Sequence, residues 1–220
     1  MNDSNTPPPK RSRQRRKPKQ HRSVETMNAI LEAGSSLFEE QGYEKTTTHQ
    51  IAARAGVSVG ALYRYFTDKE AILKEIYKRE NSLLRDRILE EFATISIADR
   101  DPGSLVREAL GRALKIYAER PKLRMVLGEQ SRKVQELIIL RRQQEDDLHR
   151  TIGRIFTSVP EIQLPDIEVS SYLTALFMES VIEDYLLHRR NHSTFTTERI
   201  LDVTTDFLLS FLLRPRGQVG

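Results

Sequence analysis

The chain has 220 residues, of which 38% are hydrophobic, and its 35 basic and 31 acidic side chains give a net charge of +4. It contains no cysteine, which excludes disulfides, thiolate metal sites and cysteine nucleophiles. No apolar run approaches the ~20 residues of a membrane span, and the N-terminus lacks an apolar signal segment, so we expect a cytoplasmic protein with no membrane partner.

Charge is distributed unevenly along the chain. Residues 1–22 hold eight basic residues against one acidic residue (net +7), residues 23–70 hold four against seven (net −3), and residues 71–220 hold 23 of each sign. A basic, proline-containing segment of this kind is typical of disorder, so we predict a disordered arm over residues 1–22. Such an arm attracts nucleic-acid phosphates and can enter a minor groove, unless it is a solvated tail that only aids solubility.

The first helix is predicted from about Ser23 to Gln41. Apolar and small residues recur there at helical spacing, and Gly42 follows as a stop signal. The residues that set this spacing are Met27, Ile30, Leu31, Gly34, Leu37 and Phe38.

Two short helices joined by a glycine are predicted next. The hydroxyl of Thr47 can accept from the amide of Gln50, whose side chain reaches back to complete a capping box, and Gly56 can take the positive φ that ends this helix. Ser58 caps the second helix, whose buried face holds Leu62 and Phe66. The pattern predicts a helix-turn-helix, in which the outward face of the second helix can enter a DNA major groove. The alternative is an ordinary helical hairpin.

The outward positions at the start of the second helix carry no long hydrogen-bonding side chain. Ser58, Val59, Gly60 and Ala61 therefore exclude bidentate contacts to guanine or adenine. We predict instead that Val59 and Ala61 contact thymine methyls, that the backbone at Gly60 approaches the DNA closely, and that His49 of the preceding helix assists.

Six short motifs lie between Ala29 and Tyr77. They are Gly42-Tyr43, Thr47-Thr48, Ile51-Ala52, Ala55-Gly56-Val57-Ser58, Leu62-Tyr63-Arg64-Tyr65-Phe66 and Lys69-Glu70-Ala71. With these motifs the segment resembles the TetR family of transcriptional regulators. The resemblance implies an all-α fold: a three-helix helix-turn-helix domain that binds DNA, residues 23–70, joined by a long helix to a larger helical domain for ligand binding and dimerisation, residues 71–215.

The resemblance also implies contacts to the DNA backbone. Tyr63, Tyr65 and Lys69 would touch sugar-phosphate groups, with Thr47 and Thr48 fixing the register. The alternatives are that Tyr63 or Tyr65 packs against the first helix, or that Arg64 is a solvent-facing charge. The predicted DNA-binding residues are Thr47, Thr48, His49, Ser58, Val59, Gly60, Ala61, Tyr63, Arg64, Tyr65 and Lys69.

A long connecting helix is predicted from Lys69, opened by a capping box from Thr67 to Glu70. Apolar pairs continue at helical period with no proline until Pro102. Nearly thirty residues at 1.5 Å each give a length of roughly 43 Å. In the family this helix carries the effect of ligand binding to the DNA-binding domains.

The remainder predicts further helices and no strand. They are expected over Ser104–Glu119, about Lys122–Phe156 with a break near Gly128, Ile167–His188 and Thr196–Leu213. In the last two, apolar residues occupy more than one stripe, so they can serve both the internal core and, by the family resemblance, a four-helix homodimer interface. The alternative is a helix pair in the core of a single subunit. The predicted interface residues are Tyr172, Leu176, Val181, Tyr185, Phe207, Leu208, Phe211 and Leu212.

A small-molecule effector would bind between the connecting helix and the later helices. The predicted lining is Tyr117, Met125, Phe177 and Met178, with Arg132 or Glu179 orienting an apolar or acidic ligand. Each of these is alternatively an ordinary core or surface residue, with no ligand at all.

These patterns predict a sequence-specific DNA-binding regulator, a homodimeric repressor released from a palindromic double-stranded DNA operator by a small molecule. No catalytic residues, metal or cofactor are expected: His188 and His192, four apart, lack the carboxylate motif of a zinc site, and no phosphate-binding glycine loop is present. The alternative is a helical ligand-binding or scaffold dimer, or an enzyme, with nonspecific nucleic-acid affinity from its basic tail.

Overall fold

The computed structural model describes residues 17–94, 101–158, 162, 164, 166–184 and 194–213. Every regular element in these ranges is a helix, which confirms the all-α prediction. The elements are α1 (Lys17–Gln41), α2 (Thr48–Arg54), α3 (Val59–Leu62), α4 (Lys69–Ala93), α5 (Pro102–Tyr117), α6 (Pro121–Ser131), α7 (Gln135–Ser158), α8 (Ile167–Glu183) and α9 (Thr197–Leu212).

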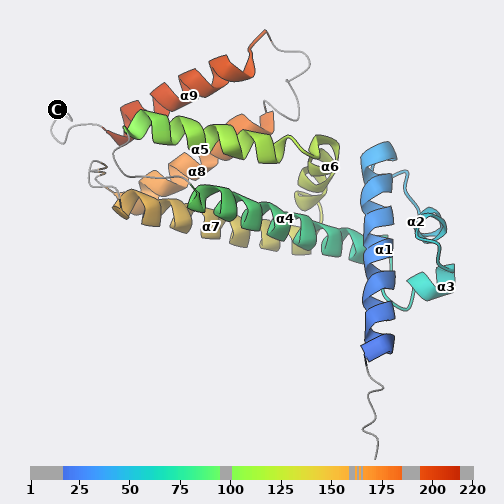
Figure 1. Cartoon of the computed structure of the whole chain (residues 1–220). Coiled ribbons are helices and arrows are strands. Elements are labelled where there is room, and N and C mark those ends of the chain that lie inside the picture. The colour runs from blue at the N-terminus through green and yellow to red at the C-terminus, as the bar shows by residue number, and fades with distance from the viewer. Residues whose placement is uncertain are drawn as a thin grey trace, which may run out of the picture.

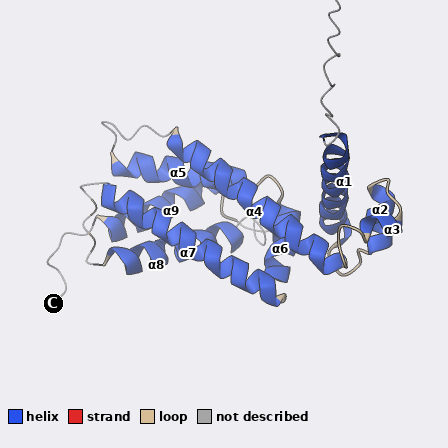
Figure 2. Ribbon diagram, turned by 90° about the horizontal axis from the view of Figure 1, so that it is seen from below, coloured by secondary structure: helices blue, strands red, loops and turns tan. Residues whose placement is uncertain are grey.

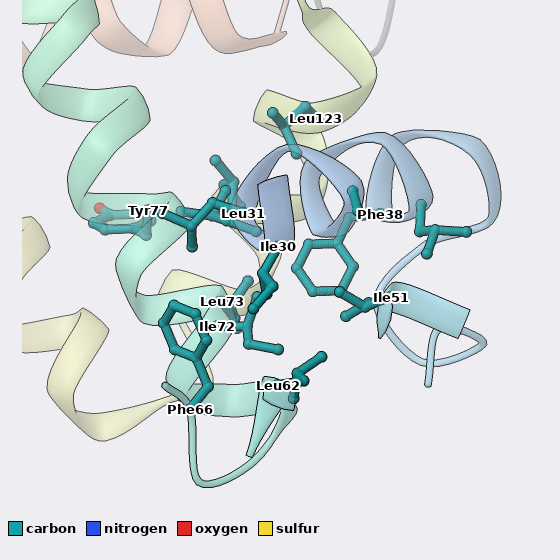
Figure 3. Packing of buried hydrophobic residues seen from close by; sticks show 14 of the residues in the cluster. Ile30, Leu31, Phe38, Ile51, Leu62, Phe66, Ile72, Leu73, Tyr77 and Leu123 are labelled. Carbon is teal, nitrogen blue, oxygen red and sulfur yellow. The ribbon is translucent and has the colours of Figure 1, made fainter. Parts of the chain in front are cut away.

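The N-terminal domain comprises α1, α2, α3 and the first turns of α4. Figure 1 shows α1 standing across one end of the molecule, with α2 and α3 on its outer side. Its core is formed by large apolar side chains that are almost completely buried, drawn in Figure 3; they include Ile30, Phe38, Ile51, Leu62, Ile72 and Leu73. Burial of each such side chain contributes about 1.5–3 kcal/mol, so this cluster fixes the angles between the four helices.

The same core extends beyond the N-terminal domain. Leu123 and Leu127 of α6 and Leu137 of α7 are buried in it, and Leu123 lies beside α1 in Figure 3. Tyr77, two turns into α4, belongs to it as well. Packing therefore does not separate the two domains at residue 70, the boundary expected from the sequence.

The C-terminal domain is built from pairs of long helices (Figures 1 and 2). α7 packs along α8, α5 packs along α9, and α4 lies against both α5 and α7. A second core joins α5, α7, α8 and α9 through Leu110, Ala113, Leu114, Phe156, Leu164, Ile182, Leu201, Leu208 and Leu212. α6 leaves this bundle and packs against α1.

Several helix boundaries differ from the expected ones. α1 begins at Lys17, so residues 17–22 of the predicted arm are helical, and residues 1–16 lie outside the described residues. α5 begins at Pro102, because Asp101 rather than a later residue accepts from the amide of Ser104 at 3.0 Å. Pro102 suits this first helical position, where no amide is needed.

Two further expectations were wrong in detail. The break expected near Gly128 comes after Ser131, because residues 132–134 form a turn before α7 and Gly128 lies inside α6. The N-cap of α4 is Asp68, whose carboxylate accepts from the amide of Ala71 at 2.7 Å, and not the hydroxyl one residue earlier. The 25 residues of α4 span roughly 37 Å.

Candidate nucleic-acid interface

The turn between α2 and α3 has the predicted geometry. Gly56 adopts φ +67°, in the left-handed region that glycine enters without strain, and its amide donates to the carbonyl of Ala53 at 3.2 Å. The amide of Val57 then donates to Ala52 at 3.0 Å. These two bonds satisfy the end of α2 and turn the chain sharply into α3.

Side-chain caps fix the start of both helices. Thr47 accepts from the amide of Gln50 at 3.2 Å while Gln50 accepts from the amide of Thr47 at 2.8 Å, which confirms the capping box. Ser58 accepts from the amide of Ala61 at 3.1 Å and caps α3 as predicted. Replacing caps of this kind costs about 1 kcal/mol each.

α3 presents a nearly featureless outer surface. Leu62 is fully buried, whereas Gly60 is exposed and Val59 and Ala61 are partly exposed. An added Cβ at Gly60 would meet nothing within 4 Å. A surface of backbone and small apolar groups can approach the floor of a major groove and contact thymine methyls, but it cannot donate bidentate hydrogen bonds.

Tyr63 joins α2 to the end of α3. The residue is 48% exposed, and its hydroxyl shares a hydrogen bond of 3.1 Å with the hydroxyl of Thr48. The bond holds the phenol at a fixed place beside the start of α2 and leaves it accessible. Tyr63 therefore does not pack into the core against α1.

The other predicted residues have different environments. His49 and Arg64 are exposed, whereas Tyr65 is half-buried against the core. The ammonium of Lys69 donates to the carbonyl of Tyr43 at 2.7 Å and lies 4.1 Å from the centre of its ring. Lys69 thus anchors α4 to the loop after α1, and a phosphate contact would have to use a remaining N–H.

Gln41 is a positioning residue that the sequence patterns missed. Its amide nitrogen donates to the carbonyl oxygen of Gln50 at 3.2 Å, to the hydroxyl of Thr46 at 3.2 Å and to the backbone of Lys45 at 3.3 Å. It ties the end of α1 to the capping box of α2. Its place directly before the helix-ending glycine was the available signal.

The predicted effector residues do not line one pocket. Met178 borders an apolar cavity of about 10 Å³, whereas Arg132 borders a separate open cleft of about 270 Å³ on α7. Arg132 binds Glu183 at 2.6 Å, and Glu179 lies 3.8 Å from Arg141. Burial raises the pKa of Glu179.

The three remaining members of this set also differ in environment. Phe177 stacks on Phe207 of α9 with ring centres 4.6 Å apart. Met125 is exposed, whereas Tyr117 is packed against the second core, and burial raises the pKa of Tyr117 to about 12.

The predicted interface residues divide into surface and core. Tyr172, Leu176 and Phe207 are each about half exposed, and Val181 and Phe211 are partly exposed. Two others, Leu208 and Leu212, face α5 within the subunit's own core and therefore offer no surface to a partner. Tyr185, also expected at the interface, lies outside the described residues.

The described residues contain no group of three or more His, Cys, Asp or Glu side chains that could hold a metal ion, while His188 and His192 lie outside them. None of the helices in the described ranges is long and apolar enough to cross a membrane.

Comparison with known proteins matches the N-terminal domain most specifically. Residues 30–76 match the family model described as bacterial regulatory proteins, tetR family. The chain is 34% identical over 112 residues to the HTH-type transcriptional regulator AcrR of Shigella flexneri, covering 51% of this chain and 50% of AcrR. It is 42% identical over 64 residues to the A-factor receptor protein of Streptomyces griseus, covering 29% of this chain and 23% of the receptor. These two relatives are thus matched over half of their length or less.

Solved structures match a much larger part of the fold. A putative TetR-family transcriptional regulator from Mesorhizobium loti superposes with a TM-score of 0.70 at 20% identity, covering 86% of this chain and 98% of that protein. Another from Syntrophomonas wolfei gives a TM-score of 0.63 at 20% identity, with 90% and 100% covered. Residues 30–76 therefore match the tetR family of bacterial regulatory proteins, and most of the chain shares the fold of these solved structures.

Proposed function

We propose that this chain is a homodimeric, sequence-specific DNA-binding regulator of transcription, and specifically a repressor that releases a palindromic operator when a small molecule binds. The observation that carries the proposal is the capped α2–Gly56–α3 unit, which exposes a face of small residues. Helices α2 and α3 lie at one end of the molecule (Figure 1). Two relatives that match the chain over 105 and 99 residues are named as repressors, the probable acrEF/envCD operon repressor of Escherichia coli and BepR of Brucella suis.

DNA binding divides between two parts of the chain. Val59, Gly60 and Ala61 offer shape and apolar contacts to base edges, with Tyr63 beside them to position the helix on the backbone. The basic residues before α1 supply nonspecific attraction, because each phosphate neutralised adds about −0.9 to the slope of log K against log salt. Specificity and salt dependence therefore arise from separable segments.

Dimerisation follows from the exposed apolar faces of α8 and α9. Tyr172, Leu173 and Leu176 on α8, together with Val203 and Phe207 on α9, are each exposed by between 45% and 63%. Large apolar side chains gathered in this way mark an interaction surface. A twofold dimer across it would present two copies of α3 to half-sites about 34–36 Å apart, or a multiple of that distance.

Effector response requires a mechanical path from the C-terminal domain to α3. α4 supplies one, and α6 supplies a second, because Leu123 is buried in the N-terminal core. Arg120, immediately before α6, donates to Glu80 of α4 at 2.9 Å and to Glu39 of α1 at 3.2 Å. A ligand that moves α6 therefore also moves α1, and a coupling of about 1–3 kcal/mol between sites is typical.

The deciding experiment selects fragments bound by the purified chain from random DNA, then measures the affinity of the enriched site at several salt concentrations. The variants are Tyr63→Ala, Tyr63→Phe and a chain lacking residues 1–16, which leaves α1 intact. We expect an enriched palindrome, a large loss of affinity for Tyr63→Ala and a smaller one for Tyr63→Phe, which keeps the ring. The shortened chain should retain the sequence preference with a shallower salt slope.

A different result would assign the chain another role. If no sequence is enriched, truncation abolishes binding and Tyr63→Ala changes nothing, the DNA affinity is nonspecific. The chain would then be a helical ligand-binding or scaffold protein with a basic tail.

A further inference from the structure

Arg124 of α6 has an unusual environment for a cation. Its Nε is buried, and no hydrogen-bond partner for this atom is found among the described residues. It lies over the ring of Tyr117, with its Cζ 5.1 Å from the ring centre. Burial lowers the pKa of Arg124, although no protein arginine loses its proton near neutral pH. Arg124 as a whole is partly buried, but a buried N–H without an acceptor is rare in proteins and calls for an explanation.

The neighbouring carboxylates are already bound by other arginines. Glu80 and Glu119 are near enough to act electrostatically on Arg124. Glu80, however, accepts from Arg120 at 2.9 Å, and Glu119 accepts from Arg87 at 2.7 Å. In the described part of the chain, no carboxylate therefore accepts a hydrogen bond from Arg124. The guanidinium lies beside an aromatic ring where α5 is followed by α6.

Apolar side chains continue from Tyr117 along α5. Leu114 and Leu110 precede Tyr117 by three and seven residues and so lie on the same side of that helix. Both line the cavity of about 10 Å³ that Met178 borders from α8. A space of this size holds about one water, but Met is flexible enough to move aside for a larger apolar group. Seven residues of helix span roughly 10 Å, the reach of a medium-length alkyl chain.

We infer that the guanidinium of Arg124 binds the carboxylate of an amphiphilic effector, whose alkyl tail lies along α5 over Leu114 and Leu110; this assignment rests on the ligand-responsive regulator proposed above. An anion would supply the hydrogen-bond acceptors and the countercharge that Arg124 lacks, and exclusion of water would strengthen the contact. Because Leu123, adjacent to Arg124, is buried in the N-terminal core, a ligand at this position acts directly on the helix that touches α1.

The test uses three probes of equal chain length, octanoate, octylamine and octanol, and measures their binding to the full chain by calorimetry in the absence of DNA. Arg124→Met removes the proposed counter-ion. Arg120→Met is the matched control, since it lies one turn away and its guanidinium is paired with Glu39 and Glu80.

We expect octanoate to bind at least tenfold more tightly than the amine or the alcohol. Arg124→Met should weaken octanoate roughly ten- to a hundredfold, as loss of a charged hydrogen bond does. Without ligand, Arg124→Met should melt at the same temperature as the native chain or higher, because it removes a buried N–H that has no acceptor. Arg120→Met should melt lower and keep its octanoate affinity.

The inference is overturned if octanoate shows no advantage over the other two probes, or if Arg124→Met binds it unchanged. A lower melting temperature for unliganded Arg124→Met would also overturn it, because Arg124 would then be a structural residue. If octanoate binding depends on Arg124 but leaves DNA binding unaltered, the inference stands and the proposed regulation fails.

Discussion

The two cores of this molecule differ in how completely they cover their large apolar side chains. In the N-terminal core, Phe38, Ile51 and Leu62 are fully buried within one chain. Around the second core, small polar residues such as Ser171 are buried, while Phe207 is 54% exposed. The N-terminal core therefore covers its large apolar side chains within one chain, whereas α8 and α9 leave some of theirs exposed, which the proposed dimer would cover.

The largest expected effect is on dimerisation through the exposed faces of α8 and α9. Phe207→Glu and Leu176→Glu each place a charge on the exposed faces of α9 and α8. If these faces meet across a twofold axis, each substitution buries two unpaired charges per dimer, at about 3–5 kcal/mol each. Sedimentation equilibrium should show a dimer become a monomer.

Leu89→Glu supplies the control for those two variants. Leu89 is similarly exposed but lies on α4, outside the proposed interface. It should leave the dimer intact. A dimer that survives both interface substitutions would contradict the comparison between the two cores.

The next largest expected effect is the loss of stability when the packing of α6 against the N-terminal core is weakened. Leu123→Ala should cost about 2–5 kcal/mol in the free energy of unfolding, as other buried Leu to Ala changes do, because Leu123 is completely buried. Urea denaturation measures this loss. Met125→Ala, two residues away but 41% exposed, should cost much less. Equal losses would mean that α6 is not part of the N-terminal core.

The sequence predicted the N-terminal domain well because its signals are local. Thr47 and Gln50 are three residues apart, and Gly56 ends α2 by its own backbone conformation, so neither depends on distant contacts. The spacing of Leu62 and Phe66 likewise predicted their burial. The packing of Leu123 in this core was not predictable. The spacing of apolar residues in α6 predicts that the helix has an apolar face, but not which distant helix packs against that face.

The residues proposed for an effector site were less predictable for the same reason. Arg132 and Glu179 were identified by residue type on neighbouring helices, yet each has a partner that the sequence does not place near it, Glu183 and Arg141. Arg124 was overlooked, because pairing of arginines is decided by tertiary contacts. A charged residue next to Leu123 predicts only a solvated surface.

A smaller effect tests the cap that joins the two regions at the start of α4. Asp68→Ala should lower the unfolding free energy by about 1 kcal/mol, since the amide of Ala71 loses its acceptor. That hydrogen bond lowers the pKa of Asp68. Its stabilisation is therefore present above the unfolded value of about 4 and is lost as the pH falls through the lower folded value.

Urea titrations between neutral and acidic pH check this assignment. Asp68→Asn keeps the acceptor without the titrating charge, so it should retain most of the stability at neutral pH. The acid-induced loss attributable to this position should disappear in Asp68→Asn. An unchanged acid profile would assign the cap to another group.

The smallest expected change in stability is at Gly60, and a comparison with Gly34 separates what the N-terminal domain needs for folding from what it needs for DNA binding. A Cβ at Gly34 would lie 3.0 Å from Ile76 and 3.1 Å from Ile72, both fully buried, so Gly34→Ala should destabilise the domain by about 1 kcal/mol or more. A Cβ at Gly60 meets nothing, and its φ is not positive, so Gly60→Ala should stabilise the chain by up to about 0.5–1 kcal/mol.

Measuring the affinity for the selected operator tests whether DNA binding requires the absence of a side chain at Gly60. The fold gains nothing from its missing side chain, so we expect Gly60→Ala to raise the melting temperature and to weaken operator binding, because the new methyl group holds α3 away from the groove. Val24→Ala, on the exposed part of α1, serves as the control and should keep full affinity. If Gly60→Ala binds the operator as tightly as the native chain, the DNA does not approach α3 at that residue and Val59 and Ala61 must provide the contact alone.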